Sequence, residues 1–193
     1  MIKTNIKDDQ ISVFVDYNTE FIEKAKNLNG KWNPIEKSWS FNLKDHEEVK
    51  NVLRNIYGED GESLTEFVNI KILTKENITS YDKGGITLKG REIARAYNKD
   101  TVKLGKTVKM ISGEIDSGGT SNKVSTIIKE NSIFLIEDFP KLLLDQIDDK
   151  FELLEIIPSE EKFRYLSKAD LLSEKERLLK RLEALEKLIE KTK

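Results

Sequence analysis

The sequence contains no cysteine among its 193 residues and only one histidine, His46. Without cysteine the chain can form neither disulfides nor thiolate metal sites, and a reducing compartment, the cytoplasm, is the expected location. No apolar run approaches the roughly 18 residues that a membrane-spanning helix needs, and residues 1–5 do not begin an apolar signal segment. These absences exclude a disulfide-stabilised secreted domain and predict no membrane function.

The residues that commonly carry catalysis are also scarce. His46 falls in the first turn of a predicted helix, where a solvated surface position is expected. Three acidic pairs lie near turns or helix ends, where local hydrogen bonds and the helix dipole favour carboxylates. The pairs are Asp8-Asp9, Glu59-Asp60 and Asp148-Asp149. None has the convergent partners of a metal-assisted hydrolase, so we predict a protein that is not an enzyme, with no catalytic residue, no metal and no cofactor.

The formal net charge of −2 conceals an uneven distribution. Residues 83–129 carry ten basic side chains against four acidic ones, which favours an anionic partner for this stretch. The candidate binding residues within it are Lys83, Lys89, Arg91, Arg95, Lys103, Lys106 and Lys123. A solvated surface that is balanced by acidic flanks is the alternative explanation of the same residues.

Two glycine-rich turns fall inside this basic stretch, at residues 84–85 and 117–121. Neither matches a Walker loop or a dinucleotide-binding fingerprint. Backbone N–H groups of such loops can still surround an anion, which makes the turns candidates for an anion-binding surface. The alternative is that their glycines only supply the positive φ angles of hairpin turns.

Residues 1–61 predict a small β-α-β-β-α module. Apolar residues alternate in the first segment with the period of a strand, and later recur with the spacing of amphipathic helices. The predicted elements are a strand within residues 6–17, a helix capped by Asn18 or Thr19, two short strands around Asn33-Pro34 that carry Trp32 and Trp39, and a helix over residues 45–57 capped by Asp45.

Residues 62–140 predict a mainly β module, because short apolar runs alternate with glycine-rich turns. The runs cover residues 67–73, 86–88, 108–111 and 133–136. Residues 90–97 fit either a helical turn or a strand. Residues 141–166 predict a connecting segment, with a short helix that follows Pro140 and a strand over residues 151–157.

Residues 167–193 predict a long amphipathic helix, which completes an α+β fold class for the whole chain. Its apolar seam contains Leu171, Leu178, Leu182, Leu185 and Ile189, and Lys175 interrupts it. Two alternatives stand for this helix. It forms a coiled coil with a second copy, giving a homodimer through residues 171–189, or it packs as an arm on its own protein.

The N-terminal module contains the motif Gly30-Lys31-Trp32-Asn33 followed by Lys37-Ser38-Trp39-Ser40-Phe41. This motif resembles the HARP-like module of DNA-annealing helicases and of short phage and mobile-element proteins. The resemblance implies binding of branched or single-stranded nucleic acid through Lys31, Trp32, Lys37 and Trp39. From the residues alone two alternatives stand: exposed tryptophans beside lysines would stack on bases, and buried ones would form the core of so small a module.

Residues 84–96, 103–106 and 117–121 are similar to a block found in mobile-element proteins, some of which are candidate inhibitors of host defence nucleases. The similarity implies a non-enzymatic phage or mobile-element protein that inhibits a nucleic-acid-handling host defence complex, such as a CRISPR effector. An anti-CRISPR protein of this kind would bind the host nuclease complex. The alternative is a direct DNA- or RNA-binding protein used in element maintenance, with nucleic acid as its partner.

Overall fold

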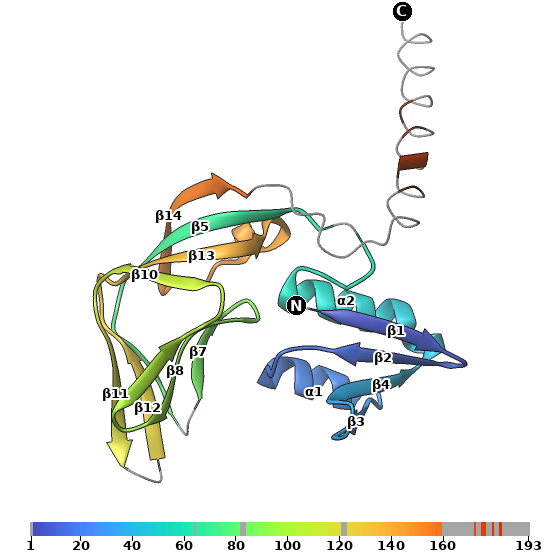
Figure 1. The fold of residues 1–193 in the computed structure, drawn as a ribbon, viewed down its shortest axis with the longest axis horizontal. Helices are drawn as coiled ribbons and strands as arrows, with labels where there is room; N and C mark the ends of the chain where they lie inside the picture. Colours follow the sequence, from blue (N-terminus) through green and yellow to red (C-terminus); the bar gives the residue numbers. More distant parts are fainter. Residues whose placement is uncertain are drawn as a thin grey trace, which may run out of the picture. The chain divides into compact units, whose positions relative to one another are not determined.

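The computed structural model describes residues 2–63, 65–81, 84–120 and 123–159, and in addition Leu172, Lys175, Glu176, Leu179 and Leu182. Of these residues 49% lie in strands and 22% in helices, so the expected α+β fold class is wrong and the described chain is mostly β. It contains four small antiparallel sheets and three helical segments (Figure 1). The longest, of 15 residues, is a 3-10 turn that continues directly into an α-helix over residues 43–57. No long C-terminal helix occurs among the residues described. The helix expected over residues 167–193 lies outside them, apart from five single helical positions.

A four-stranded sheet and two helices form the N-terminal module. Its elements are β1 (Lys3–Lys7), β2 (Gln10–Phe14), α1 (Thr19–Asn27), β3 (Lys31–Asn33), β4 (Ser38–Asn42), the 3-10 turn η1 (Leu43–Asp45) and α2 (His46–Tyr57). The antiparallel strands lie in the order β1-β2-β4-β3. A single strand within residues 6–17 was expected, but β1 and β2 form a hairpin there. Asp8 has a left-handed φ of 53° and reverses the chain between the paired Lys7 and Gln10.

The helix ends follow from local chemistry. The side chain of Asn18 accepts a hydrogen bond of 2.9 Å from the Phe21 backbone N–H, which confirms the predicted cap of α1. Asp45 makes no such bond at the start of α2; instead the Asn42 side chain accepts from the Lys44 N–H one turn earlier. Gly58 ends α2 with a left-handed φ of 73°.

The first core lies in this module. It consists of Ile2, Ile11, Val13, Phe21, Ala25, Trp39, Phe41, Val49, Leu53, Ile56 and Tyr57. The Trp39 ring contacts Phe21 edge to face, with ring centroids 6.2 Å apart, and Tyr57 donates a hydrogen bond of 2.9 Å to the Asp16 carbonyl. Burial, with smaller effects of nearby Asp16 and Glu20, raises the pKa of Tyr57 far above its ordinary range. The Tyr57 phenol therefore stays neutral, and its hydrogen bond to Asp16 fixes the segment that leads into α1.

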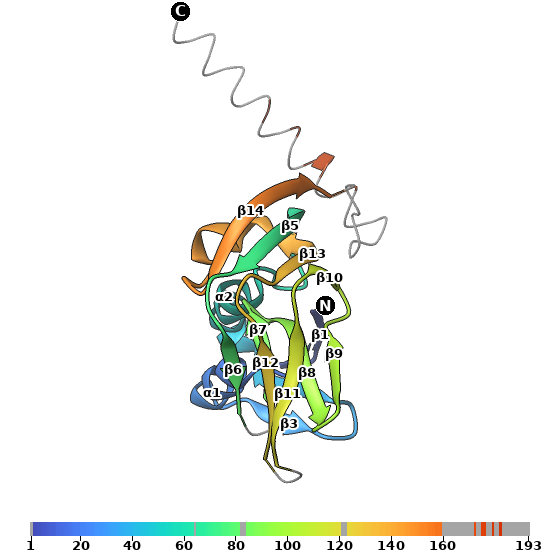
Figure 2. The same ribbon diagram turned by 90° about the vertical axis from the view of Figure 1, so that its left-hand side faces the viewer.

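Three further antiparallel sheets follow, in the orders β10-β13-β5-β14, β11-β12-β6 and β7-β8-β9 (Figure 1). Their strands are β5 (Phe67–Thr74), β6 (Ile78–Ser80), β7 (Gly85–Leu88), β8 (Arg91–Asn98), β9 (Thr101–Leu104), β10 (Val108–Ser112), β11 (Ile115–Thr120), β12 (Lys123–Ile128), β13 (Ile133–Pro140) and β14 (Phe151–Pro158). The segment 90–97, which fitted a helical turn or a strand, is β8. Figure 2 shows β12 beside β8, where the Ala96 N–H donates to the Thr126 hydroxyl at 2.8 Å.

A second core fills the space between these sheets. Its buried members are Val68, Ile70, Ile72, Ile78, Ile86, Leu88, Ile93, Ala94, Val108, Ile128, Phe134, Ile136, Phe139, Leu143 and Phe151. Leu143 comes from the 3-10 helix η2 (Lys141–Gln146) and Phe151 from β14. The predicted connecting segment, residues 141–166, therefore contributes side chains to the core of the β module. No helix in the described part of the chain is long and apolar enough to cross a membrane.

Arg91 joins the two cores. Its Nη2 lies 3.4 Å from the Oε1 of Glu59, which is in the segment that follows α2. The same Nη2 donates a hydrogen bond of 3.0 Å to the Asp138 carbonyl in β13. The side chains of Arg91 and Glu59 are only 15% and 5% exposed. A side chain at Gly90 would collide with the Tyr57 ring, so glycine there permits the close approach. Arg91 therefore has an internal structural contact and adds little to the exposed basic surface.

Replacing Arg91 with leucine should leave Glu59 buried without its cation. Removing one partner of a buried ion pair costs about 3–5 kcal/mol, and we expect a fall of that order in the free energy of unfolding at neutral pH, measured by urea denaturation. Burial raises the pKa of Glu59 and Arg91 opposes this rise. Loss of Arg91 would raise the pKa of Glu59 further. In the variant, Glu59 is protonated and neutral below that pKa, and the free energy of unfolding falls as pH rises through it. The destabilisation should therefore shrink as pH falls.

The matched control adds Glu59→Gln to the Arg91→Leu variant. It removes the uncompensated charge and should recover much of the lost stability. A loss that is equal at every pH and is not recovered by Glu59→Gln would show that Arg91 stabilises the protein through packing alone.

Candidate nucleic-acid interface

Cationic and aromatic side chains gather on one face of the sheet β7-β8-β9. Arg95 of β8 is partly exposed between the buried Ala94 and Ala96, and the exposed Tyr97 lies at a bulge where the pairing of β8 with β9 shifts by one residue. The strand register places Lys103 of β9 directly opposite Arg95. Lys103 also reaches the Tyr97 ring, so Arg95, Tyr97 and Lys103 gather at one surface.

Each of the two cations lies over a tyrosine ring. Lys103 Nζ is 5.4 Å from the centroid of the Tyr97 ring, and Arg95 Cζ is 6.0 Å from that of Tyr17, which precedes α1. The Arg95 Nε also donates a hydrogen bond to the Glu92 carboxylate. Tyr97 is 56% exposed and Tyr17 68%, so both rings remain accessible to a ligand.

Arg95 also lines a cavity of about 420 Å³, which is within the size range of small-ligand sites. Tyr81, at 74% exposure, stands at this cavity together with Tyr17. Hydroxyl side chains and backbone complete the wall: Thr19, Ser80, Thr87, Gly84 and Gly85. We call Tyr17, Tyr81, Arg95, Tyr97 and Lys103 the tyrosine–cation strip. It offers flat rings, two positive charges and neutral hydrogen-bonding groups.

Gly84 and Gly85 line the cavity, and neither has a positive φ. Their lack of a side chain instead allows neighbouring groups to approach closely. A Cβ on Gly85 would lie 2.8 Å from the Glu92 Oε2 and 3.2 Å from the Arg95 Nη2, and one on Gly84 would lie 2.5 Å from the Ser80 Oγ. Gly119, in the other glycine-rich turn, does have a positive φ, of 89°. The predicted role of supplying a positive φ therefore holds for Gly119 and not for Gly84 or Gly85.

The other basic residues predicted from the sequence are placed elsewhere or are not described. Lys83 lies outside the described residues. Lys89 Nζ donates a 3.4 Å hydrogen bond to Gln146, next to the second core. Lys106 and Lys123 are exposed, in the loop after β9 and at the start of β12 respectively.

The two tryptophans differ in burial. Trp39 is 8% exposed and belongs to the first core, whereas Trp32 is 48% exposed. Their ring centroids are 5.7 Å apart across the β3–β4 hairpin. Lys31 and Lys37 are both exposed on the same hairpin. Trp32 alone of the pair can therefore present its ring to a ligand.

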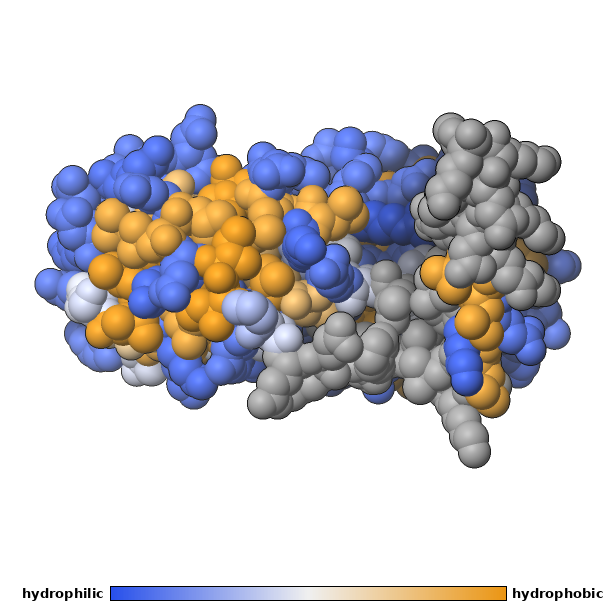
Figure 3. Space-filling model, turned by 90° about the horizontal axis from the view of Figure 1, so that it is seen from above, coloured by the Kyte–Doolittle hydropathy of each residue, from blue (hydrophilic) through white to orange (hydrophobic). Residues whose placement is uncertain are grey.

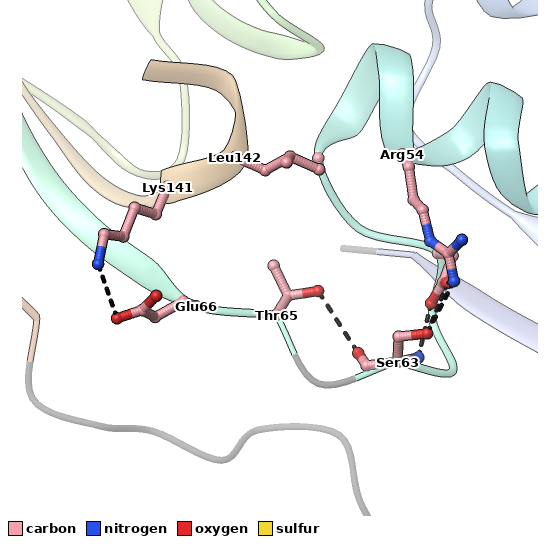
Figure 4. Close-up of a pocket in the computed structure, with 8 residues that line it drawn as sticks. Arg54, Ser63, Thr65, Glu66, Lys141 and Leu142 are labelled. Atoms are coloured by element: carbon pink, nitrogen blue, oxygen red, sulfur yellow. Dashed lines mark hydrogen bonds and ion pairs between the residues drawn. The ribbon is translucent and has the colours of Figure 1, made fainter. Parts of the chain in front are cut away.

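A second pocket, of about 390 Å³, lies near the end of α2 and is lined largely by charges that are already paired (Figure 4). Arg54 Nη2 is 2.6 Å from Asp60 Oδ2, and Lys141 Nζ is 3.0 Å from Glu66 Oε1. The Asp60 carboxylate also accepts from the Ser63 N–H at 2.6 Å and from the Ser63 hydroxyl at 2.9 Å. These contacts fix the turn that ends the N-terminal module, and they leave this pocket without an uncompensated charge among the residues described.

The acidic pairs and the histidine form no metal site. In the part of the chain that the structure describes, no group of three or more histidine, cysteine or acidic residues could hold a metal ion. His46 was expected to be solvated, but its Nε2 is 2.7 Å from Glu62 Oε1 and its side chain is only 23% exposed.

Sequence reasoning missed the three tyrosines of the strip. Regular alternation could not place Tyr97, because the pairing of β8 shifts between Glu92 and Ala94 and again between Ala96 and Asn98, and Ile93, two residues before Arg95, is fully buried. Tyr17 and Tyr81 come from a loop before a helix and a loop after a short strand. Their approach to Arg95 depends on tertiary packing that no local pattern encodes.

Comparison with family models, curated proteins and solved structures finds no match for this chain.

Substitution of Asp60 with asparagine should test the turn that Figure 4 shows. Hydrogen bonds to charged groups contribute about 1.5–3 kcal/mol each, so we expect the free energy of unfolding to fall by about 2 kcal/mol. Burial alone would raise the pKa of the Asp60 carboxyl. Hydrogen bonds from the Ser63 and Glu62 N–H groups and the Ser63 hydroxyl, together with the Arg54 cation, hold that pKa below its ordinary value. A lowered pKa gives stability that is present above the unfolded pKa and is lost as pH falls through the folded one.

The variant should therefore lose part of the acid dependence of stability, as followed by thermal melts across the acidic range. Glu66→Gln is the matched control, because it breaks an exposed pair and should cost less than about 1 kcal/mol. Equal effects of the two substitutions would contradict the assignment.

Proposed function

We propose that the protein binds single-stranded nucleic acid, without catalysis, through the tyrosine–cation strip. The observation that carries this proposal is the pairing of Arg95 with Tyr17 and of Lys103 with Tyr97 on one exposed sheet face. Proteins that bind single strands combine aromatic rings, on which bases stack, with cations that follow the phosphates. The strip supplies both, and the cytoplasm is the proposed place of action.

The chemistry of the strip favours stacking over charge. Glu92 already neutralises part of the Arg95 charge, and the chain as a whole carries a formal net charge of −2. Stacking on an aromatic side chain contributes about 1–3 kcal/mol per base and tolerates every base, because each has a flat π face. The proposed binding is therefore weakly selective for sequence. The cavity beside Tyr81 is the proposed position of one base.

The β3–β4 hairpin is the proposed second contact. Trp32 presents a half-exposed ring between the exposed Lys31 and Lys37, and the resemblance of this segment to the HARP-like module supports the same kind of ligand. Trp39 is not included, because it is buried in the first core.

The proposal is tested with a labelled single-stranded oligonucleotide and fluorescence anisotropy over a range of salt concentrations. Each phosphate contact to a single strand contributes about −0.7 to the slope of log affinity against log salt, so Arg95→Gln/Lys103→Gln should lower the slope by about 1.4. Tyr81→Ala should weaken binding on the order of tenfold with the slope unchanged, because it removes stacking and no charge.

Lys71→Gln/Lys109→Gln is the matched control. Both lysines are ion-paired on the sheet β10-β13-β5-β14, to Glu155 and Glu137, and their removal should leave affinity and slope unchanged. Equal effects of the two double variants would show that binding follows net charge alone and would remove the strip from the proposal.

The inhibitor of a host defence complex stays a prediction, and one experiment separates it from direct binding. Tagged protein is used to recover partners from a host lysate with and without nuclease. Direct nucleic-acid binding predicts that nuclease removes all recovered material. A protein complex that survives nuclease treatment and is lost with Arg95→Gln/Lys103→Gln would favour the inhibitor.

A further inference from the structure

β14 is an edge strand that carries exposed apolar side chains. It has β5 as its one neighbour among the described residues of the sheet β10-β13-β5-β14. Leu154 is 42% and Ile156 49% exposed. The left of Figure 3, where the molecule is seen from above, shows a largely apolar surface with a few hydrophilic residues. A long edge strand with unpaired N–H and C=O groups can pair with another strand.

The two faces of β14 are symmetric about its midpoint. Residues opposite the buried positions of β5 define the inner face, and these are Phe151, Leu153, Ile156 and Pro158. The outer face has Glu152, Glu155 and Ile157, opposite Leu73, Lys71 and Asn69. Leu154 is the additional residue of a bulge between Leu153 and Glu155. Reversal of the strand about the point between residues 154 and 155 therefore exchanges inner positions with inner ones and outer positions with outer ones.

We propose that a second copy of this chain pairs antiparallel along β14, with Phe151 opposite Pro158. This register pairs all eight residues of the strand and keeps both faces of the sheet continuous. It places Glu152 opposite Ile157, and Glu155 opposite Leu154. No carboxylate lies directly opposite another, and the two Glu155 side chains beside the two-fold axis each have Lys71 of their own chain as a partner at 3.0 Å.

Other registers lack this match. A shift of one residue in either direction sets inner side chains opposite outer ones, because side chains alternate between the faces. A shift of two residues in one direction brings Glu152 opposite Glu155, where like charges directly opposite each other destabilise the pair. The full-length register thus combines the greatest number of pairs with matched faces and no directly opposed carboxylates.

The pairing also accounts for the exposure of Ile156. This side chain lies on the inner face opposite Ile70, which is fully buried, yet Ile156 is 49% exposed at the edge of the sheet. In the dimer, Leu153 of the second copy lies opposite Ile156 and covers it. Two-fold symmetry gives two such contacts. The other edge strand, β10, has five residues and offers a shorter pairing surface.

Light scattering coupled to size exclusion tests the proposal. The full-length chain should have the mass of a dimer, and Ile156→Lys should have that of a monomer, because the substitution puts a charge on the inner face at the junction. The matched control is Ile111→Lys, which alters a residue of similar exposure, 55%, in the opposite edge strand β10 and should remain dimeric. Far-UV circular dichroism and thermal melts verify that both variants are folded.

Cross-linking tests the register, since the chain has no cysteine of its own. Glu152→Cys/Ile157→Cys should form disulfides between chains on mild oxidation, because the two positions lie opposite each other. Neither single cysteine should cross-link, because each is then far from its copy along the strand.

A monomeric full-length protein would overturn the proposal. A dimer that persists in Ile156→Lys and forms no cross-link would also overturn it, and this is the result expected from a dimer through residues 171–189. Cross-linking by the single cysteines would show that the strands pair in another register.

Discussion

The contact between Arg91 and Glu59 is the constraint on which the described structure depends. Each module has its own core, and the two cores meet where a nearly buried guanidinium lies beside a nearly buried carboxylate. Ions so little exposed are tolerated only as partners, because the desolvation of either alone is costly. The Asp138 carbonyl adds a third group, so one side chain connects the end of the N-terminal module, β8 and β13. Glycine at position 90 is the steric condition for this arrangement.

The same residue begins β8, and the position of the strand decides what the surface presents. Arg91 turns inward at the first position of β8, and four residues later Arg95 turns outward beside Tyr97. Two arginines of one strand, which composition alone cannot tell apart, therefore have different roles. Arg91 stabilises the contact between cores, while Arg95 has a partly exposed cation at a cavity wall.

Local patterns predicted the elements that local chemistry controls. Asn18, one of the two predicted caps, and the turn at Asn33-Pro34 each follow from the preference of one or two residues, and the structure has both. The fold class was wrong because the alternating segment 6–17 conceals a reversal at Asp8, and because the weakly apolar segment Ile115–Thr120 becomes a strand by forming a hairpin with Lys123–Ile128.

The candidate site was predictable only in its charges. Arg95 and Lys103 were both selected from local basicity, yet their juxtaposition follows from the register of β8 with β9. Arg91 was selected by the same reasoning, yet its side chain is nearly buried. The prediction failed there because charge along the chain does not distinguish a solvated cation from a buried one. Tyr17 is contributed by the other module, and its contact with Arg95 exists only in the assembled structure.

That last feature has a thermodynamic consequence. Tyr17 precedes α1 in the N-terminal module, whereas Arg95 and Tyr81 belong to the β module, so the cavity wall spans both. Any molecule held there would contact both modules and would bind the folded protein in preference to the unfolded chain. Occupancy would then raise the free energy of unfolding by mass action, in proportion to the logarithm of ligand concentration. The stability of the two-module unit would therefore depend on how much ligand surrounds the protein.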